Sequence, residues 1–100
     1  MANGIIVSTP KTIKYYDHNI ALNSVSWITS GRGKYYTSVD ISSHISGKII
    51  SITPTNWNSL YVDDIVQPYI SDNMKIGIIS NKNSFYSSAD MTFRCVYIDE

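Results

Sequence analysis

The sequence predicts an all-β fold, and three observations carry this prediction. The chain has 16 isoleucines and eight tyrosines but only two leucines, three alanines and one glutamate, and β-branched and aromatic side chains favour pleated strands over helices. Apolar runs of strand length recur with glycine, proline or asparagine between them. A chain of 100 residues supports one hydrophobic core. We therefore expect a single antiparallel β-sandwich domain over residues 1–100, jelly-roll-like, with about seven to eight strands.

The composition also excludes several classes of function. Eight basic side chains balance eight acidic ones, and charged residues make up 16% of the chain. Binding to nucleic acid or to an anionic membrane needs a basic surplus, so we expect neither partner. No segment approaches the roughly 18 consecutive apolar residues of a membrane span, and the first residues lack a secretory signal. We expect synthesis in a cytoplasm and no membrane insertion.

The first third of the chain predicts short strands. We expect the first strand over Gly4–Ser8 and the second over Thr12–Tyr16. The second strand is expected to end at the polar residues Asp17–Asn19. The apolar alternation resumes after this segment but changes parity near Asn23 and Ser24. Because a change of parity moves side chains to the opposite face of a sheet, we expect a bulge or a break there.

The middle of the chain contains the clearest hairpin. Ser30–Gly33 carries two glycines between a strand that ends at Thr29 and a strand over Lys34–Ser42, and glycine supplies the positive φ of tight hairpin turns. The isoleucine-rich run Lys48–Thr53 predicts the next strand, and Pro54 limits its hydrogen-bond ladder or marks its end.

The following segment predicts a loop and a restricted strand. Asn56–Ser59 is expected to be a loop that presents Trp57. Leu60–Ile70 is expected to be a strand, in which Pro68 requires an edge position, a bulge or a strand end.

The last third predicts a turn, two strands and a long loop. Asp72 and Asn73 form a turn into the strand Met74–Ser80, and the polar segment Asn81–Asp90 separates it from the last strand, Met91–Ile98. Alternate residues from Met91 to Tyr97 share one face of this strand. Cys95 belongs to that face, so we expect a small buried apolar residue rather than a reactive thiol.

The sequence lacks the signatures of catalysis and of metal binding. His18 and His44 stand 26 positions apart without the spacing of zinc ligands. Asp63 and Asp64 form an acidic pair within the chain, and a solvated pair or a loop cap is the favoured interpretation over acid–base or calcium chemistry. Neither a Gly-x-Ser-x-Gly motif nor a phosphate-binding loop is present. We expect no enzymatic activity, no cofactor and no metal site.

The aromatic residues are the remaining candidates for ligand contact. Trp57, Tyr61 and Tyr86 lie near predicted loops, and such side chains combine an apolar face with a polar edge that suits both sugar rings and protein interfaces. Core or interface packing is the favoured interpretation for each, and ligand contact is the alternative. Exposure of Trp57 in a groove near Tyr61 or Tyr86 would favour binding, and burial would favour a purely architectural role.

The second half of the chain carries a resemblance in five segments: Val39–Ser43, Ser46–Ile52, Asn56–Trp57, Asp64–Ile70 and Thr92–Ile98. Together they resemble the small β domains at the carboxyl ends of tail fibres and head fibres of tailed bacteriophages, which often finish with a strand of the Arg-x-x-Tyr-Ile kind. The resemblance covers residues 24–98. It implies a virion surface protein, commonly trimeric, whose outer loops contact a receptor on the bacterial cell, often a polysaccharide.

The chain departs from fibre proteins in its amino-terminal part, because residues 1–23 take the place of a long shaft. This segment is expected to be a docking or strand-exchange arm, since an unpaired strand can add to the edge of a neighbouring sheet. The candidate docking residues are Ile5, Ile6, Val7, Tyr15 and Tyr16.

The leading hypothesis is a structural protein of a bacteriophage virion, a fibre-tip or adaptor-like domain. It would form a homo-oligomer, with a trimer favoured, contact other virion proteins and bind a bacterial surface polysaccharide or another receptor through its loops. The first alternative is an architectural protein without a ligand, such as a capsid decoration protein, a head fibre or a baseplate component. The second is an unrelated lectin-like carbohydrate-binding module.

Overall fold

The computed structural model describes residues 12–99, which form seven strands. These are β1 (Thr12–Ala21), β2 (Ile28–Gly31), β3 (Lys34–Asp40), β4 (Lys48–Asn58), β5 (Val66–Asp72), β6 (Lys75–Ser80) and β7 (Asp90–Asp99). Every paired strand is antiparallel, and the described residues contain no helix. The predicted all-β class is confirmed.

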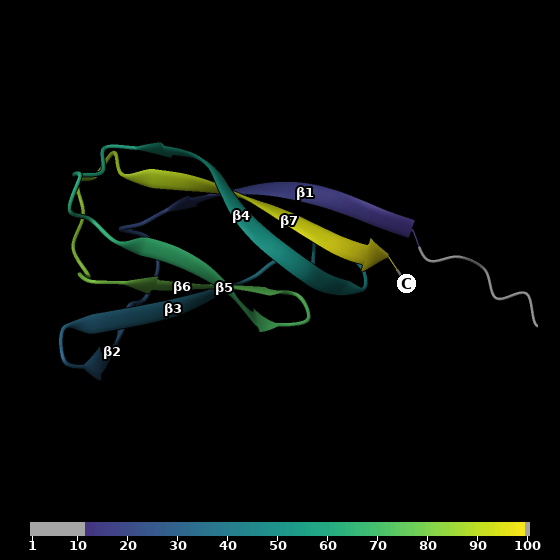
Figure 1. Cartoon of the computed structure of the whole chain (residues 1–100), viewed down its shortest axis with the longest axis horizontal. Coiled ribbons are helices and arrows are strands. Elements are labelled where there is room, and N and C mark those ends of the chain that lie inside the picture. The colour runs from purple at the N-terminus through teal and green to yellow at the C-terminus, as the bar shows by residue number, and fades with distance from the viewer. Residues whose placement is uncertain (1–11, 100) are drawn as a thin grey trace, which may run out of the picture.

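The strands form two layers (Figure 1). One sheet has three strands in the order β1-β7-β4, and the other has four strands in the order β2-β3-β6-β5. The inner faces of the two sheets enclose the core, as in a β-sandwich. The predicted two-layer architecture is confirmed, with seven strands in the described part of the chain.

Strand β7 lies at the centre of the core. Met91, Phe93, Cys95 and Tyr97 alternate along it and are buried, as the sequence predicted. Burial raises the pKa of the Cys95 thiol to about 11, so the thiol stays protonated at neutral pH and packs as a small apolar group.

Strand β1 is longer than the sequence predicted. The expected end at Asp17–Asn19 is wrong, because β1 pairs with β7 without interruption from Thr12↔Asp99 to Ala21↔Asp90. On this strand Asp17 pairs with Arg94 of β7 at 2.9 Å. A polar segment can therefore remain part of a strand when its side chains pair with side chains of the neighbouring strand. The break predicted near Asn23 is confirmed, since β1 ends at Ala21 and a turn follows.

Strand β4 also runs further than predicted. Pro54 does not end it, and Asn56–Asn58 belong to the strand rather than to a loop. An edge strand tolerates proline because one side of its backbone has no partner, and β4 is an edge of the three-stranded sheet. The predicted strand over Leu60–Ile70 is too long at its start, because β5 begins at Val66 and the preceding residues form the β4–β5 loop.

Both predicted turns are present. In the β2–β3 hairpin, Gly31, Arg32 and Gly33 have φ values of 84°, 58° and 71°, which explains the two glycines at this position. A turn after Asp72 joins β5 to β6. Pro68 lies in β5, which is an edge strand as predicted.

The candidate docking residues have different positions. Ile5, Ile6 and Val7, and the strand predicted over Gly4–Ser8, lie outside the described residues. Tyr15 is exposed on β1, and Tyr16 is half-buried against the core.

Candidate functional site

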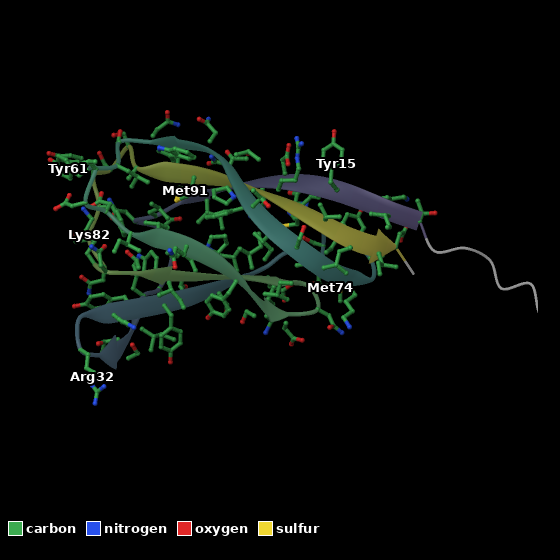
Figure 2. All side chains as sticks on the ribbon, viewed as in Figure 1. Tyr15, Arg32, Tyr61, Met74, Lys82 and Met91 are labelled. Carbon is green, nitrogen blue, oxygen red and sulfur yellow. The ribbon has the colours of Figure 1, made fainter. Side chains whose placement is uncertain are left out.

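A hollow lies at the end of the sandwich where the β4–β5 loop leaves the three-stranded sheet. Figure 2 shows Tyr61 at this end, close to Lys82. The volume of the hollow is about 480 Å³. Its lining is mainly apolar and consists of Pro54, Trp57, Leu60, Tyr61, Val62, Asp64, Val66 and Met91.

A register shift in β4 turns Trp57 toward this hollow. The pairing with β7 shifts between Pro54 and Asn56, so that Trp57 lies opposite Met91. Met91 points into the sandwich and forms part of its buried core. Because one extra residue in a strand exchanges its two faces, the shift puts Trp57 on the inner face at the open end of the sandwich. The side chain is 57% exposed there.

A second hollow of about 240 Å³ lies beside the first, lined by Tyr61, Lys82, Ser84, Phe85 and Tyr86. Tyr61 lines both hollows. Its hydroxyl is hydrogen-bonded to the hydroxyl of Tyr86, with the ring centroids 5.4 Å apart. The structure thus brings the three predicted ligand-binding residues together, with Trp57 and Tyr61 in one hollow and Tyr61 and Tyr86 in the other.

Asp64 holds the β4–β5 loop in place. One of its carboxylate oxygens accepts a hydrogen bond from the Tyr61 backbone N–H at 2.9 Å, and the other lies 2.7 Å from Lys82 Nζ. The side chain is only 4% exposed. The hydrogen bond from Lys82 holds the pKa of Asp64 below its ordinary value, so the residue stays a carboxylate. Asp64 is therefore a loop cap, one of the two interpretations that the sequence favoured for Asp63 and Asp64.

Lys82 joins the ion pair to the aromatic residues. Its Nζ lies 5.2 Å from the centroid of the Tyr61 ring and 4.9 Å from that of Phe85, within the range of cation–π attraction. Sequence reasoning missed Lys82, because it lies 18 positions after Asp64 and only the fold brings the two together.

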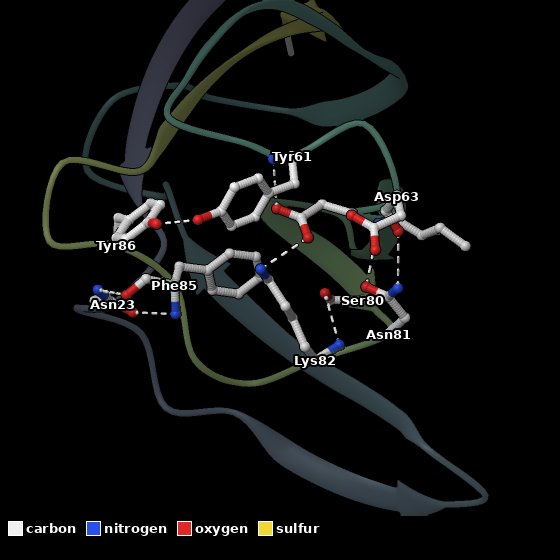
Figure 3. A network of polar contacts seen from close by, with 10 residues as sticks. Asn23, Tyr61, Asp63, Ser80, Asn81, Lys82, Phe85 and Tyr86 are labelled. Atoms are coloured by element: carbon white, nitrogen blue, oxygen red, sulfur yellow. Dashed lines mark hydrogen bonds and ion pairs between the residues drawn. The ribbon is translucent and has the colours of Figure 1, made fainter.

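Further polar contacts tie the β4–β5 loop to the β6–β7 loop (Figure 3). The Ile65 N–H donates to Asn81 Oδ1 at 3.1 Å, and the Asn81 side-chain amide donates to the Asp63 carbonyl at 3.1 Å. Ser59 and Ser88 hydroxyls are 2.7 Å apart. These contacts order both loops before any ligand arrives, which lowers the entropic cost of binding.

A separate aromatic cluster joins β1 to the β3–β4 loop. Tyr16 stacks on His44 with ring centroids 4.9 Å apart, and its hydroxyl lies 3.0 Å from His18 Nδ1. Burial, and to a smaller extent His44, lower the pKa of His18. The sequence showed no zinc-ligand spacing between the two histidines, which stand 26 positions apart, but the fold places their rings 5.5 Å apart. Within residues 12–99, no three His, Cys, Asp or Glu side chains gather in the manner of a metal site.

The two hollows combine flat apolar surfaces with a few polar groups. Trp57 and Tyr61 offer flat apolar faces, and the exposed Val62 adds an apolar wall. The tyrosine hydroxyls and Asp64 supply a few polar groups. An apolar lining with a small number of oriented polar groups is typical of sites for small organic ligands.

Comparison with family models, with curated proteins and with solved structures finds no match to this chain. Over the described residues, the fold has no helix with the length and apolar character needed to cross a membrane.

Proposed function

We propose that this chain is a non-enzymatic binding domain of a bacteriophage particle, and that it holds a host-surface polysaccharide in the hollows around Tyr61. The observation that carries the proposal is the exposure of Trp57 beside Tyr61 in a concave, pre-ordered site. An indole or phenol ring that lies open at a hollow presents its face to the apolar side of a sugar ring.

The shape of the site supports a ligand of more than one ring. Tyr61 lines both a larger hollow and a smaller one, and both are open to solvent. Successive rings of an oligosaccharide would occupy the two hollows, with Tyr61 in contact with both. The paired charges of Asp64 and Lys82 favour a ligand without a strong net charge at this position, because each charge already has its partner.

The virion assignment is supported by the resemblance of the strand and turn motifs in residues 24–98. The genes beside the coding sequence test this part of the proposal. Neighbouring tail or capsid genes would support a particle protein, and neighbours that encode carbohydrate metabolism would favour the lectin-like module instead.

A glycan array of bacterial surface polysaccharides tests the ligand. We expect the wild-type chain to bind at least one polymer, and Trp57→Ala to bind the same polymer about 30-fold more weakly, since a central aromatic contact contributes about 2 kcal/mol. Tyr36→Ala is the matched control, because Tyr36 is an exposed aromatic residue on the outer face of the other sheet. It should bind like the wild type.

Two results would contradict the proposed ligand. Equal losses in the Trp57→Ala and Tyr36→Ala variants would show that the hollows are not the site. The absence of binding by the wild-type chain would favour the architectural alternative, in which the domain only assembles with other particle proteins.

A further inference from the structure

We propose that the edge of β1, which has no partner strand within residues 12–99, pairs with β1 of a second copy of this chain, antiparallel and about a two-fold axis. The inference is independent of the sugar-binding proposal, because β1 contributes no residue to either hollow around Tyr61. It rests on the backbone and the side chains of Thr12–Ala21.

Among the four sheet edges within residues 12–99, only β1 lacks a structural block. Strand β4 has two register shifts and Pro54, strand β5 has one shift and Pro68, and β2 has only four residues. Strand β1 has ten residues, no proline and an unbroken register with β7. Proteins prevent edge-to-edge pairing with bulges, prolines and short strands, and β1 has none of these.

The charges of β1 do not block its edge either. Lys14 Nζ lies 2.7 Å from Asp99, and Asp17 accepts two hydrogen bonds from Arg94, at 2.9 and 3.0 Å. Asp99 and Arg94 both belong to β7. A lysine on an edge strand usually hinders the addition of another strand, because its ammonium group stays in water. The ammonium group of Lys14 instead points to Asp99 of the neighbouring strand β7.

Two large apolar side chains stand beside this free backbone. Ile13 is 66% exposed and Tyr15 is 62% exposed. They occupy alternate positions and so share one face, the outer face of the three-stranded sheet. Figure 2 shows Tyr15 projecting from β1 away from the sandwich. An added strand would cover both residues through cross-strand contacts.

The pairing of β1 with itself forms a closed assembly. Antiparallel pairing of identical strands is two-fold symmetric, so each copy presents the same patch. In a register centred near Tyr15, the Ile13 and Tyr15 side chains of both copies lie on one face of a six-stranded sheet. That sheet ends at β4 on both sides, where Pro54 and the register shifts prevent further addition. The geometry therefore indicates a dimer, whereas the family resemblance implied a trimer.

Sedimentation equilibrium of the full chain, from about 1 to about 100 µM, tests this interface. We expect a dimer, and a rise of at least about tenfold in its dissociation constant in the double variant Ile13→Lys/Tyr15→Lys, because four lysines would then meet across the edge. Ile28→Lys is the control, since Ile28 is 51% exposed on the edge strand β2 of the other sheet. It should dimerise like the wild type. Circular dichroism verifies that each variant is folded.

Hydrogen exchange of the wild-type chain provides a second readout that needs no variant. In an antiparallel sheet, alternate residues direct their N–H groups to opposite neighbours. The β1 amides that point away from β7 should therefore gain protection as the protein concentration rises. A monomer at every concentration, a trimer, equal dissociation by Ile28→Lys, or concentration-independent exchange in β1 would each overturn the proposal.

Discussion

The loop end of the molecule and the β1 edge expose aromatic side chains to a similar degree but in different settings. Trp57 is 57% exposed and Tyr15 is 62% exposed. Trp57 borders a hollow whose loops are held by Asp64, Asn81 and Lys82, whereas Tyr15 stands on a regular strand beside unpaired backbone. The two aromatic residues therefore differ in the shape of the surrounding surface and in the pairing of the neighbouring backbone, not in exposed area. These differences are the reason for proposing a ligand at one region and a second copy of the chain at the other.

The largest effect is expected from the core residue that connects the two regions. Phe93 is fully buried in the middle of β7, and Phe93→Ala should lower the free energy of unfolding by about 3–5 kcal/mol. We expect both regions to unfold in one transition, measured by tryptophan fluorescence and by far-ultraviolet circular dichroism in denaturant. Two separate transitions would mean that the loop end and the β1 edge are independent units.

A smaller effect is expected where an aromatic ring has a structural role. Tyr69 lies opposite Gly77 in the four-stranded sheet, and its ring covers the glycine so closely that a Cβ atom there would overlap it. Gly77→Ala should therefore lower the stability by about 1–3 kcal/mol.

The double variant Gly77→Ala/Tyr69→Ala separates this clash from a change of backbone propensity. It should be less destabilised than the sum of its two single variants, as thermal unfolding can measure. Simple additivity would mean that Tyr69 is an exposed aromatic of the same kind as Tyr61 rather than a cover for Gly77.

The ion pair at the loop end should contribute more to the stability of the fold than the ion pair on β1. Asp64→Ala removes a nearly buried carboxylate and leaves Lys82 and the Tyr61 N–H without their acceptor, so we expect a loss of about 1–2 kcal/mol. Asp17→Ala removes the exposed partner of Arg94 and is the matched control, with a smaller loss because water screens this pair. Urea denaturation measures both. A larger loss for Asp17→Ala would reverse the comparison.

The smallest effect is a pH dependence on the β1 side. Burial and the neighbouring His44 lower the pKa of His18 in the folded chain, so near pH 6 the unfolded chain binds more protons than the folded one. The neutral form of His18 therefore contributes to the free energy of unfolding, and this contribution is complete above the ordinary pKa of about 6.5. It is lost as the pH falls through the lower pKa of His18 in the folded chain.

Denaturation between about pH 5 and about pH 8 measures this dependence. The slope contributed by His18 should disappear in His18→Gln. Titration by nuclear magnetic resonance should show an upward shift of the His18 pKa in His44→Gln, because the repulsion from His44 is removed. A wild-type His18 that titrates at or above its ordinary value would contradict the packing of the Tyr16–His18–His44 cluster.

Part of the candidate site could be predicted from the sequence. Trp57, Tyr61 and Tyr86 were identifiable because aromatic residues stand out in polar segments. For Asp63 and Asp64 the sequence favoured a solvated pair or a loop cap, but only the structure shows that Asp64 caps the Tyr61 N–H. Lys82 and Asn81 were not identifiable, because the sequence pattern does not show which loops meet at one end of a sandwich.

The composition and the alternation of residues determined the all-β class, the β2–β3 hairpin and the buried face of β7, because these depend on local propensity and on the two-residue period of a strand. Tertiary structure alone decided that β4 passes through Pro54, that the register shift beyond it turns Trp57 inward, and that β1 is the edge left without a block. Each of these depends on which strands become neighbours, since pairing and edge position are properties of the whole sheet and not of any one segment.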